Sequence, residues 1–491
     1  MCCNCCSVLQ KKIWVITIGI LCVVIGVTLI VFSPHSKDYI AHSYLPLSPN
    51  SWMFNKWLNP PMTSYMCVYL FNWTNMHEAT NRNVKPNFSQ HGPYVFRETR
   101  SKEDIIWHEN DTMTYYNRRS WFFEKEMSGG SLDDAIILPH PPTVIAAKEV
   151  QNMNRYVKKI LNYFLKTEGG SLGVNKKAEE WIFKGFPDPM TEFVGLFLTE
   201  LTSLRLEKFG FLYGRNASKT YEGTYTIHTG QKDLSMLGEL AKWRGKNQSN
   251  SFEGECSRIN GSTGDLFAPE HGPDDILSVF IPDTCRSINL FPGEKMIYRD
   301  IEAVKYTTND MTFDSGQLYP NMKCYCSGSD ESKCPRTGVI DLGPCLYGAP
   351  LYLSLPHFLN ADPSYAAAIT GMEPDPKEHN FYMILEPRLG CPLSGNANMQ
   401  INMLVEPHDS IEMLNDVNEF YAPLIILSEQ GDIDESFAIL VRLFFKFPGI
   451  FLGIGIAILV IGLILLSMAI YLSCTNKWEG NRKRDDIFSK H

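Results

Sequence analysis

Two long uncharged apolar runs, one near each end of the 491-residue chain, constrain its fold more than any other feature. The first extends from Ile13 to Phe32 and the second from Gly449 to Leu472, and each can cross a bilayer core of roughly 30 Å. The first run exceeds the roughly 7–15 apolar residues of a signal peptide and precedes no small-x-small cleavage site, which favours a retained anchor. A buried core helix does not explain the second run, because its apolar character covers every face. We therefore predict transmembrane helices over residues 13–32 and 447–473.

Basic residues flank both runs on the side of the nearer chain terminus. Lys11 and Lys12 precede the first run, and four cations follow the second: Lys477, Arg482, Lys483 and Arg484. Because positive residues mark the cytosolic side of a membrane span, we expect both tails, residues 1–12 and 474–491, to lie in the cytosol. The segment between the spans, residues 33–446, is then expected to be an ectodomain.

The middle segment carries two features of an oxidising, extracellular location. It contains six N-glycosylation sequons, at Asn72, Asn87, Asn110, Asn216, Asn247 and Asn260. It also contains an even number of cysteines, as a disulfide framework requires: Cys67, Cys256, Cys285, Cys324, Cys326, Cys334, Cys345 and Cys391. Sequons also arise by chance, so the prediction depends on their agreement with the cysteines and the flanking charges.

Composition and pattern favour one mixed ectodomain. The net charge of −9 is mild and diffuse, which gives no indication of a nucleic-acid partner. We find no repeat or flexible linker between the spans. Alternation of apolar and polar residues and β-rich runs predict strands at Thr63–Phe71, Tyr221–Ile227, Phe381–Leu385 and Met399–Met403.

One stretch before Gly169-Gly170 has helical periodicity. Its apolar stripe recurs at spacings of three and four: Val150, Met153, Val157, Ile160, Leu161, Phe164 and Leu165. We expect Val174 to Lys184 to start another helix. With the strand-like sequence that follows, the predicted fold class is α+β.

The other side of this helix is basic, with Arg155, Lys158, Lys159 and Lys166, and Lys148 precedes it. A solvated helix face is the ordinary explanation and is preferred on the residues alone. The functional alternative is a cationic docking patch that attracts anionic ligands by its clustered charge.

Candidate catalytic and metal motifs fail in their context. Gly169-Gly-Ser-Leu-Gly173 has the spacing of a nucleophile elbow, but it follows an amphipathic helix rather than a strand. Cys324-Tyr-Cys326 has too short a spacing for a structural zinc site, and an oxidising compartment favours disulfides. We find no other metal motif and no phosphate-binding loop, so we expect no enzyme activity, no metal and no cofactor.

Five cysteines lie beside the membrane spans: Cys2, Cys3, Cys5, Cys6 and Cys474. Cytosolic thiols at a bilayer surface are candidates for reversible palmitoylation. Unmodified thiols are the ordinary alternative. Metal binding by the first four is less favoured, because no histidine adjoins them.

Several segments, in order along the chain, resemble the scavenger receptor class B family. They are Gly92-Pro-Tyr-Val-Phe-Arg-Glu98, Val174 to Met190, Phe209-Gly-Phe-Leu-Tyr213, Cys256-Ser-Arg-Ile-Asn-Gly261, Asp283-Thr-Cys-Arg-Ser-Ile288, Cys324-Tyr-Cys326, Tyr352 to Leu359 and Gln400-Ile-Asn-Met403. They span the whole ectodomain. The cysteine-dense amino terminus and the length are most similar to the branch of insect apoptotic-cell receptors typified by croquemort.

The resemblance implies a fold and a set of disulfides. It implies an irregular antiparallel β-barrel with an apical helical bundle and a lipid tunnel, anchored by N- and C-terminal transmembrane helices. The implied disulfides are Cys256–Cys324, Cys285–Cys345 and Cys326–Cys334. Cys67 and Cys391 fall outside that set, and either a fourth bridge or two free thiols is compatible with the sequence.

The resemblance also favours the docking-patch interpretation of the basic helix. The implied ligand-binding residues are Lys148, Arg155, Tyr156, Lys158, Lys159 and Lys166, although Glu168 lies near the position where the family pattern has a second lysine. The implied partners are lipids (anionic or oxidised phospholipid, fatty acid, sterol) and the apoptotic cells, microbes or lipoproteins that carry them, and the oligomeric state stays open.

We therefore predict a scavenger receptor of the plasma membrane, endosomal after uptake, that captures lipid ligands or transfers lipid through its ectodomain. Within the same family, a sensory-neuron or a carotenoid/lipid transport member is the alternative. An ecto-nucleotidase with two anchors would need phosphate-binding motifs that we do not find. A channel would need polar residues in its spans, which offer only Thr17, Thr28, Ser467 and Cys22.

Overall fold

The computed structural model describes residues 8–167, 170–191, 208–272, 274–326, 334–475 and 478. The chain divides into two compact units. The helix-pair unit comprises residues 1–45 and 435–491, and the barrel unit comprises residues 46–434.

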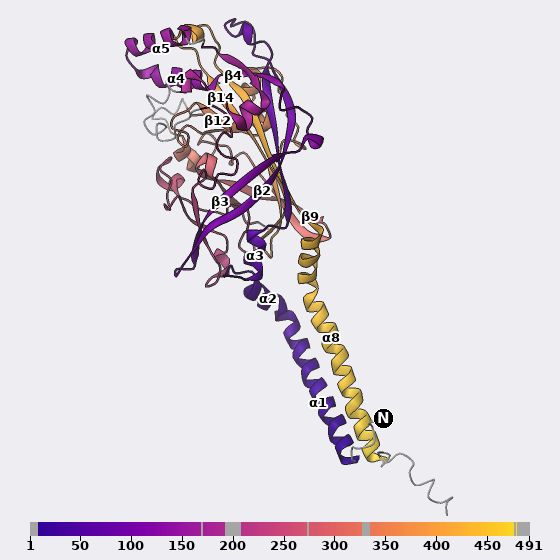
Figure 1. Ribbon diagram of the computed structural model, residues 1–491. Helices are drawn as coiled ribbons and strands as arrows, with labels where there is room; N and C mark the ends of the chain where they lie inside the picture. The colour runs from indigo at the N-terminus through magenta and orange to yellow at the C-terminus, as the bar shows by residue number, and fades with distance from the viewer. Residues whose placement is uncertain are drawn as a thin grey trace, which may run out of the picture. The chain divides into compact units, whose positions relative to one another are not determined.

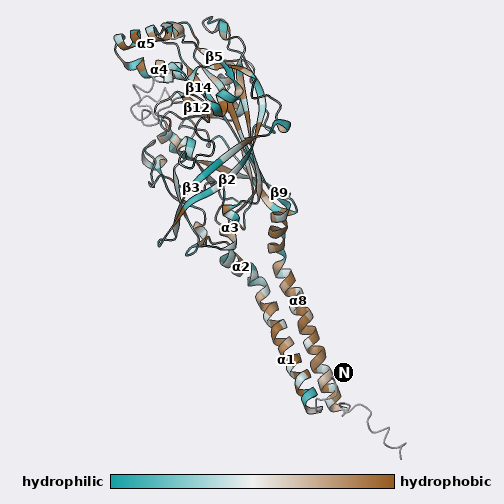
Figure 2. Cartoon of the chain, viewed as in Figure 1, coloured by the Kyte–Doolittle hydropathy of each residue, from teal (hydrophilic) through white to brown (hydrophobic). Residues whose placement is uncertain are grey.

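The helix-pair unit contains the two apolar runs. Helix α1 (Val8–Phe32) is followed by a 3₁₀ turn (Ser33–His35) and by α2 (Ser36–Tyr44), and α8 (Glu435–Cys474) is a single 40-residue helix. Both long helices are apolar enough to cross a membrane (Figure 2). Helix α8 begins twelve residues before the predicted span, because residues Glu435 to Lys446 are also helical.

Glycines allow α1 and α8 to pack backbone against backbone. A Cβ atom at Gly26 would lie 2.7 Å from the amide nitrogen of Leu459, and one at Gly462 would lie 2.8 Å from that of Val23. Helices inside a bilayer usually associate through close packing of this kind, because burial of apolar surface does not favour their association in lipid.

The barrel unit is built on a thirteen-stranded antiparallel sheet (Figure 1). Eleven strands follow the order β7-β6-β3-β2-β1-β15-β14-β13-β10-β9-β8, and β12 joins β11 to β14. Their bounds are β1 Met62–Trp73, β2 Phe88–His108, β3 Thr112–Phe123, β6 Thr224–His228, β7 Leu240–Trp243, β8 Leu277–Ile281, β9 Arg286–Tyr298, β10 Ile301–Thr307, β11 Val339–Asp341, β12 Leu351–Ser354, β13 Tyr382–Glu386, β14 Cys391–Val405 and β15 Phe420–Ile433. The predicted strands overlap β1, β6, β13 and β14, although β6 begins only at Thr224, three residues after the predicted start.

Short helices and a two-stranded ladder complete this unit. The helices are α3 (Trp52–Leu58), α4 (Pro141–Glu149), α5 (Arg155–Thr167) and α7 (Pro363–Ala367), and the ladder pairs β4 (Ala135–Pro139) with β5 (Gly173–Lys177). Helices α4 and α5 lie together at one end of the barrel unit, and α3 lies toward the other end (Figure 1). The prediction of a helix over Val174 to Lys184 is wrong in its first part, which pairs with β4, and right in its second, where helical backbone begins at Ala178 and ends in a π turn (Glu180–Lys184).

Strands from opposite ends of the unit's sequence are neighbours at the centre of the sheet. Met62, at the start of β1, pairs with Ile433, at the end of β15. The amide of Asp434 donates to the carbonyl of Pro61 at 3.0 Å. The chain therefore enters and leaves the barrel unit side by side.

A short segment joins the two edge strands, β7 and β8. Leu240 donates to the carbonyl of Gly261, and Ser262 donates to that of Ser278, both at 2.8 Å. Phe280 donates back to the carbonyl of Ser262 at 2.8 Å. The edges are thus brought together into a nearly closed barrel, as the resemblance implied.

Three disulfides link the loops on the β8–β10 side of the barrel unit. They are Cys256–Cys324, Cys285–Cys345 and Cys326–Cys334, the pairs that the resemblance implied. The fourth bridge is not formed, and Cys67 and Cys391 are free. Across the sheet, Cys67 lies opposite Ser428, which lies opposite Asn398. Cys391 is seven residues from Asn398 along β14, roughly 20 Å away, far beyond disulfide reach.

Closure of the barrel depends on a glycine at position 261. Gly261 has a φ of +80°, and a Cβ atom there would lie 2.5 Å from the carbonyl oxygen of Ser278. We predict that Gly261→Ala lowers the free energy of unfolding by about 3 kcal/mol, from backbone strain and a clash that separates the edges. The matched control is Gly245→Ala, at a φ of +76° with nothing within 4 Å, which should cost about 1–2 kcal/mol. Denaturant unfolding of the purified full chain measures both, and equal losses would contradict the role of Gly261.

Candidate functional site

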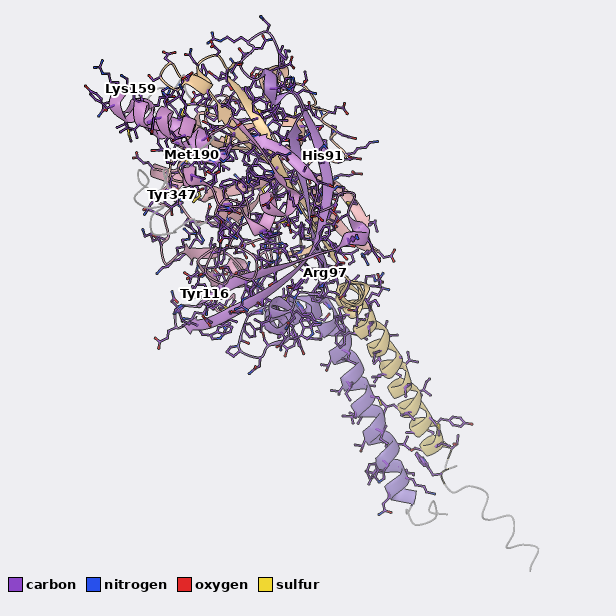
Figure 3. The ribbon with its side chains drawn as sticks, turned by 45° about the horizontal axis from the view of Figure 1, so that its top comes forward. His91, Arg97, Tyr116, Lys159, Met190 and Tyr347 are labelled. Carbon is purple, nitrogen blue, oxygen red and sulfur yellow. A yellow bond between two sulfur atoms is a disulfide. The ribbon has the colours of Figure 1, made fainter. Side chains whose placement is uncertain are left out.

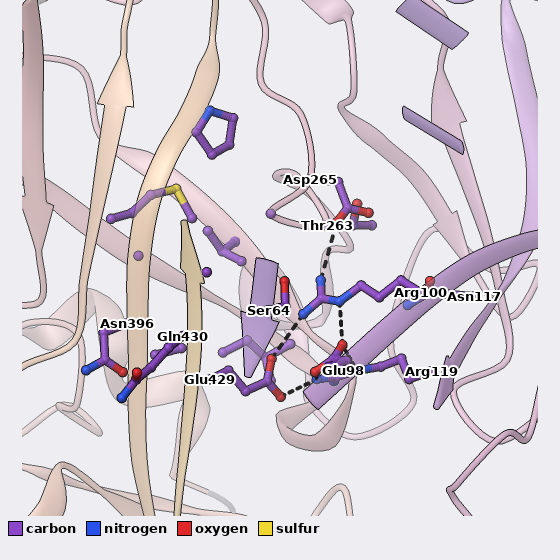
Figure 4. A pocket seen from close by; sticks show the side chains of 18 of the residues that line it. Ser64, Glu98, Arg100, Asn117, Arg119, Thr263, Asp265, Asn396, Glu429 and Gln430 are labelled. Atoms are coloured by element: carbon purple, nitrogen blue, oxygen red, sulfur yellow. Dashed lines mark hydrogen bonds and ion pairs between the residues drawn. The ribbon is translucent and has the colours of Figure 1, made fainter. Parts of the chain in front are cut away.

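The barrel unit contains a partly open cavity of about 200 Å³ beside the place where the chain enters and leaves this unit. Strands β1, β2, β3, β14 and β15 contribute to its wall, together with the loop that follows Ser262. One side of the wall is charged, with Glu98, Arg100, Arg119, Glu222, Asp265 and Glu429 (Figure 4). The rest of the lining mixes polar side chains such as Asn396 and Gln430 with apolar ones: Met62, Val279, Phe280, Phe381, Met383 and Met399. The cavity is therefore amphipathic.

Glu98 of β2 is the centre of the charged wall. Its side chain is 1% exposed and accepts hydrogen bonds from Nε of Arg100 at 2.5 Å and from Nε and Nη2 of Arg119, each at 2.8 Å. Nε1 of Trp121 donates to the same carboxylate at 3.1 Å. Burial opposes the charged form, but Arg100 and Arg119 outweigh it and hold the pKa of Glu98 well below its ordinary value.

Three further carboxylates lie near the arginines, and the most distant is Glu222, at 3.7 Å from Nη1 of Arg119. Glu429 of β15 lies 2.6 Å from Nη2 of Arg119 and 3.4 Å from Nη2 of Arg100. Asp265 lies 3.3 Å from Nη1 of Arg100 and 2.7 Å from Nζ of Lys102. Burial again opposes ionisation, and Lys102 and Arg100 keep the pKa of Asp265 below its ordinary value.

The network has a small negative excess. It holds three cations (Arg100, Lys102 and Arg119) against four carboxylates (Glu98, Glu222, Asp265 and Glu429). Arg100 and Glu429 remain 27% and 26% exposed, so their polar edges face the cavity. Such charged groups can bind the polar end of an amphiphile, while the apolar side chains of the lining accept hydrocarbon.

Sequence reasoning missed this cluster. Its local signal is the alternation of Glu98, Arg100 and Lys102, which places three charges on one face of β2. Arg119, Asp265 and Glu429 come from distant parts of the chain, and only the sheet pairing brings them together.

The predicted basic residues lie on α4 and α5, and their charges are not equally available. Lys148 is paired with Glu406 at 2.7 Å and Lys166 with Glu412 at 2.5 Å. Arg155, Lys158 and Lys159 have no ion pair among the residues that the structure describes, and Lys159 lies on the second turn of α5 (Figure 3). The free positive charge is therefore smaller than the sequence suggested.

The acidic partners belong to one segment, residues 406–412, that accompanies α5. Its backbone is tied to the helix through Asn162, whose side-chain amide donates to the carbonyl of Ser410 and whose oxygen accepts from the amide of Glu412. Burial, followed by the charge of Lys158, lowers the pKa of His408 in this segment.

The buried side of α5 differs from the prediction. Leu161 and Leu165 are buried, as the periodicity indicated, but Ile160 is 59% exposed. The helix begins later than the apolar pattern, because Asn154 caps it by accepting hydrogen bonds from Tyr156 and Val157. The preceding residues form a separate 3₁₀ turn, Val150–Asn152.

The remaining predicted sites differ in accessibility. Asn110, Asn216, Asn247 and Asn260 are exposed, while Asn72 and Asn87 are half-buried. Cys474 is exposed at the end of α8, and Cys2, Cys3, Cys5 and Cys6 lie outside the described residues. Among the described residues there is no group of three or more side chains that could hold a metal ion.

The Glu98 network should be sensitive to removal of one charge. We predict that Glu98→Gln lowers the free energy of unfolding by about 3–5 kcal/mol, because it removes the charge-assisted hydrogen bonds that Arg100 and Arg119 donate to this buried carboxylate. The matched control is Glu103→Gln, five residues further along β2. Its partner Arg118 lies 3.1 Å away and is 40% exposed, so this substitution should cost less than about 1 kcal/mol. Thermal and denaturant unfolding of the full chain measure both, and a Glu98→Gln variant as stable as the control would refute the central role of Glu98.

Comparisons with known proteins give a consistent result. The family model described as the CD36 family matches residues 17–473, which include most of both apolar helices. Protein peste of Drosophila melanogaster is 32% identical over 87% of this chain and 76% of its own length. Scavenger receptor class B member 1 of Rattus norvegicus is 29% identical over 95% and 91%, and sensory neuron membrane protein 1 of Plutella xylostella is 30% identical over 82% and 79%.

Proposed function

The chain belongs to the CD36 family, and on that premise we propose that it is a cell-surface scavenger receptor for particles that bear anionic or oxidised lipid. Its family, as predicted from the sequence, is one of membrane receptors. The particles are apoptotic cells, microbes or lipoproteins, and the receptor feeds their uptake or the transfer of their lipid. The plasma membrane is its site of action, with both tails in the cytosol, the sequons glycosylated and the juxtamembrane cysteines acylated.

The observation that carries the proposal is the trio of cations on α5. Arg155 and Lys159 are exposed and Lys158 is half-buried, and none of the three has an ion pair within the described ranges. Basic residues near an anionic lipid surface contribute about 1 kcal/mol each. Three of them are therefore enough to concentrate anionic particles at this end of the barrel unit.

The amphipathic cavity supports the second part of the proposal. An acyl chain released from a captured particle would lie against the apolar side chains of the lining, where burial stabilises it by about 25 cal/mol per Å². Its polar end would remain at Arg100 and Glu429. A continuous passage that joins this cavity to the outside is part of the proposal, and no covalent step is required.

The two sets of basic residues should differ in their effect on capture. We predict that the triple variant Arg155→Gln/Lys158→Gln/Lys159→Gln binds phosphatidylserine vesicles at least about tenfold more weakly at low salt. The double variant Lys148→Gln/Lys166→Gln should lose less than about threefold, because Glu406 and Glu412 already neutralise these lysines. Binding of fluorescent vesicles to cells that display the full chain measures this, after correction for surface level by biotinylation.

A salt series provides the control for that experiment. Screening should abolish the difference between the triple variant and the wild type at high salt. Equal losses by the triple and double variants, or none, would remove these three cations from the proposal.

Filling the cavity should displace its lipid. Ala397 of β14 lines the cavity, so we predict that Ala397→Phe reduces several-fold the lipid that co-purifies with the full chain, measured by mass spectrometry against protein amount. The matched control is Ala367→Phe, at an exposed position at the end of α7, which should leave the bound lipid unchanged. Detergent-washed wild type without acyl chains would contradict the lipid cavity.

A further inference from the structure

Helix α5 exposes three large side chains that its own packing does not need. Tyr156, Ile160 and Tyr163 are 64%, 59% and 71% exposed. Their spacing of four and three places them in one stripe along the helix. Leu161 and Leu165, on another face, are buried and hold the helix against the unit.

A basic row lies beside this apolar stripe. Arg155 and Lys159 each lie one position before a member of the stripe, and Lys166 lies three positions after one. On a helix these positions border the stripe along one side. The guanidinium of Arg155 lies 5.4 Å from the centre of the Tyr156 ring. The exposed surface of α5 thus has two parts, one apolar and aromatic and one cationic.

We propose that this stripe enters the interfacial layer of an anionic lipid surface, with the cations beside it at the headgroups. Tyrosine favours the membrane–water interface because its ring is apolar and its hydroxyl is polar, and isoleucine favours the hydrocarbon below. Helices that lie in an interface combine such an apolar face with lysine and arginine at its border. The inference rests on the proposed function and adds to it that capture is partly hydrophobic and requires a lipid layer, not only a free headgroup.

The occupant is argued from charge complementarity and from the chemistry of the stripe. A wholly electrostatic docking surface would have no use for three exposed apolar side chains next to its cations. The acidic segment 406–412 neutralises Lys166 and Lys148, which leaves few free charges, so the apolar contacts must supply part of the affinity.

The test removes the stripe and keeps every cation. Full-length protein is displayed on cells, and binding of fluorescent vesicles of phosphatidylcholine, with or without phosphatidylserine, is measured at low and high salt. We expect Tyr156→Ser/Ile160→Ser/Tyr163→Ser to bind phosphatidylserine vesicles about tenfold more weakly at both salt concentrations. The matched control, Ile106→Ser/Ile297→Ser, removes two side chains that are 57% and 66% exposed elsewhere on the barrel unit and should bind like the wild type.

Three results would overturn the inference. The first is a stripe variant that binds vesicles as strongly as the wild type does. This includes a variant that loses only its binding to apoptotic cells, which would mean that the stripe binds a protein. The second is an equal loss when soluble phosphoserine is the probe, which would make the stripe part of a headgroup site. If the variant does not reach the cell surface, the double variant Tyr156→Trp/Tyr163→Trp is tested instead, and we expect it to bind the vesicles more tightly than the wild type. Unchanged or weaker binding by this variant is the third result that would overturn the inference.

Failure of the inference and failure of the proposed function give different results. If the proposed function is wrong, wild-type cells bind phosphatidylserine vesicles no better than untransfected cells. If only the inference is wrong, wild-type binding remains strong and is lost in the cation variant but not in the stripe variant.

Discussion

The barrel unit depends on closing a sheet around charged side chains. Antiparallel strands leave unpaired backbone groups at both edges, and the Gly261–Ser262 segment satisfies them by bonding to β7 and to β8. Closure places the Glu98 cluster inside, where each charge requires a partner. The cluster joins β2, β3, β15 and the loop at Asp265, so the same ion pairs that are satisfied by closure also hold the wall together. The closed sheet and the paired charges inside it therefore depend on each other.

Much of the fold could be predicted from local sequence, and the interior could not. The apolar runs, the strand at Thr63–Phe71 and the cysteine-rich motifs are local patterns, and they led to the correct family and fold class. Val174 was assigned to a helix because its local sequence does not show that it pairs with the remote strand β4. Ile160 was assigned to the buried stripe because periodicity does not say which apolar residues a helix exposes. The cavity depends on residues more than 300 positions apart, such as Arg100 and Glu429, and the basic patch was overestimated because segment 406–412 is equally remote.

Capture and accommodation, as proposed, use different physical means in one unit. At the end that carries α5, long-range charge attraction and exposed tyrosines would bind the intact lipid surface of a particle. In the cavity, a single amphiphile exchanges water for apolar side chains and keeps its polar end at a fixed pair of charges.

The pairing of β1 with β15 also governs when the molecule can be completed. The chain is synthesised from Met62 toward Ile433, so the central partner of β1 is among the last segments to appear. Until then, one edge of β1 stays without its partner strand, and the loops that carry the disulfides are made before β15. The two halves of the sheet can therefore be joined only late in synthesis, and a chain interrupted before β15 would leave the edge of β1 exposed.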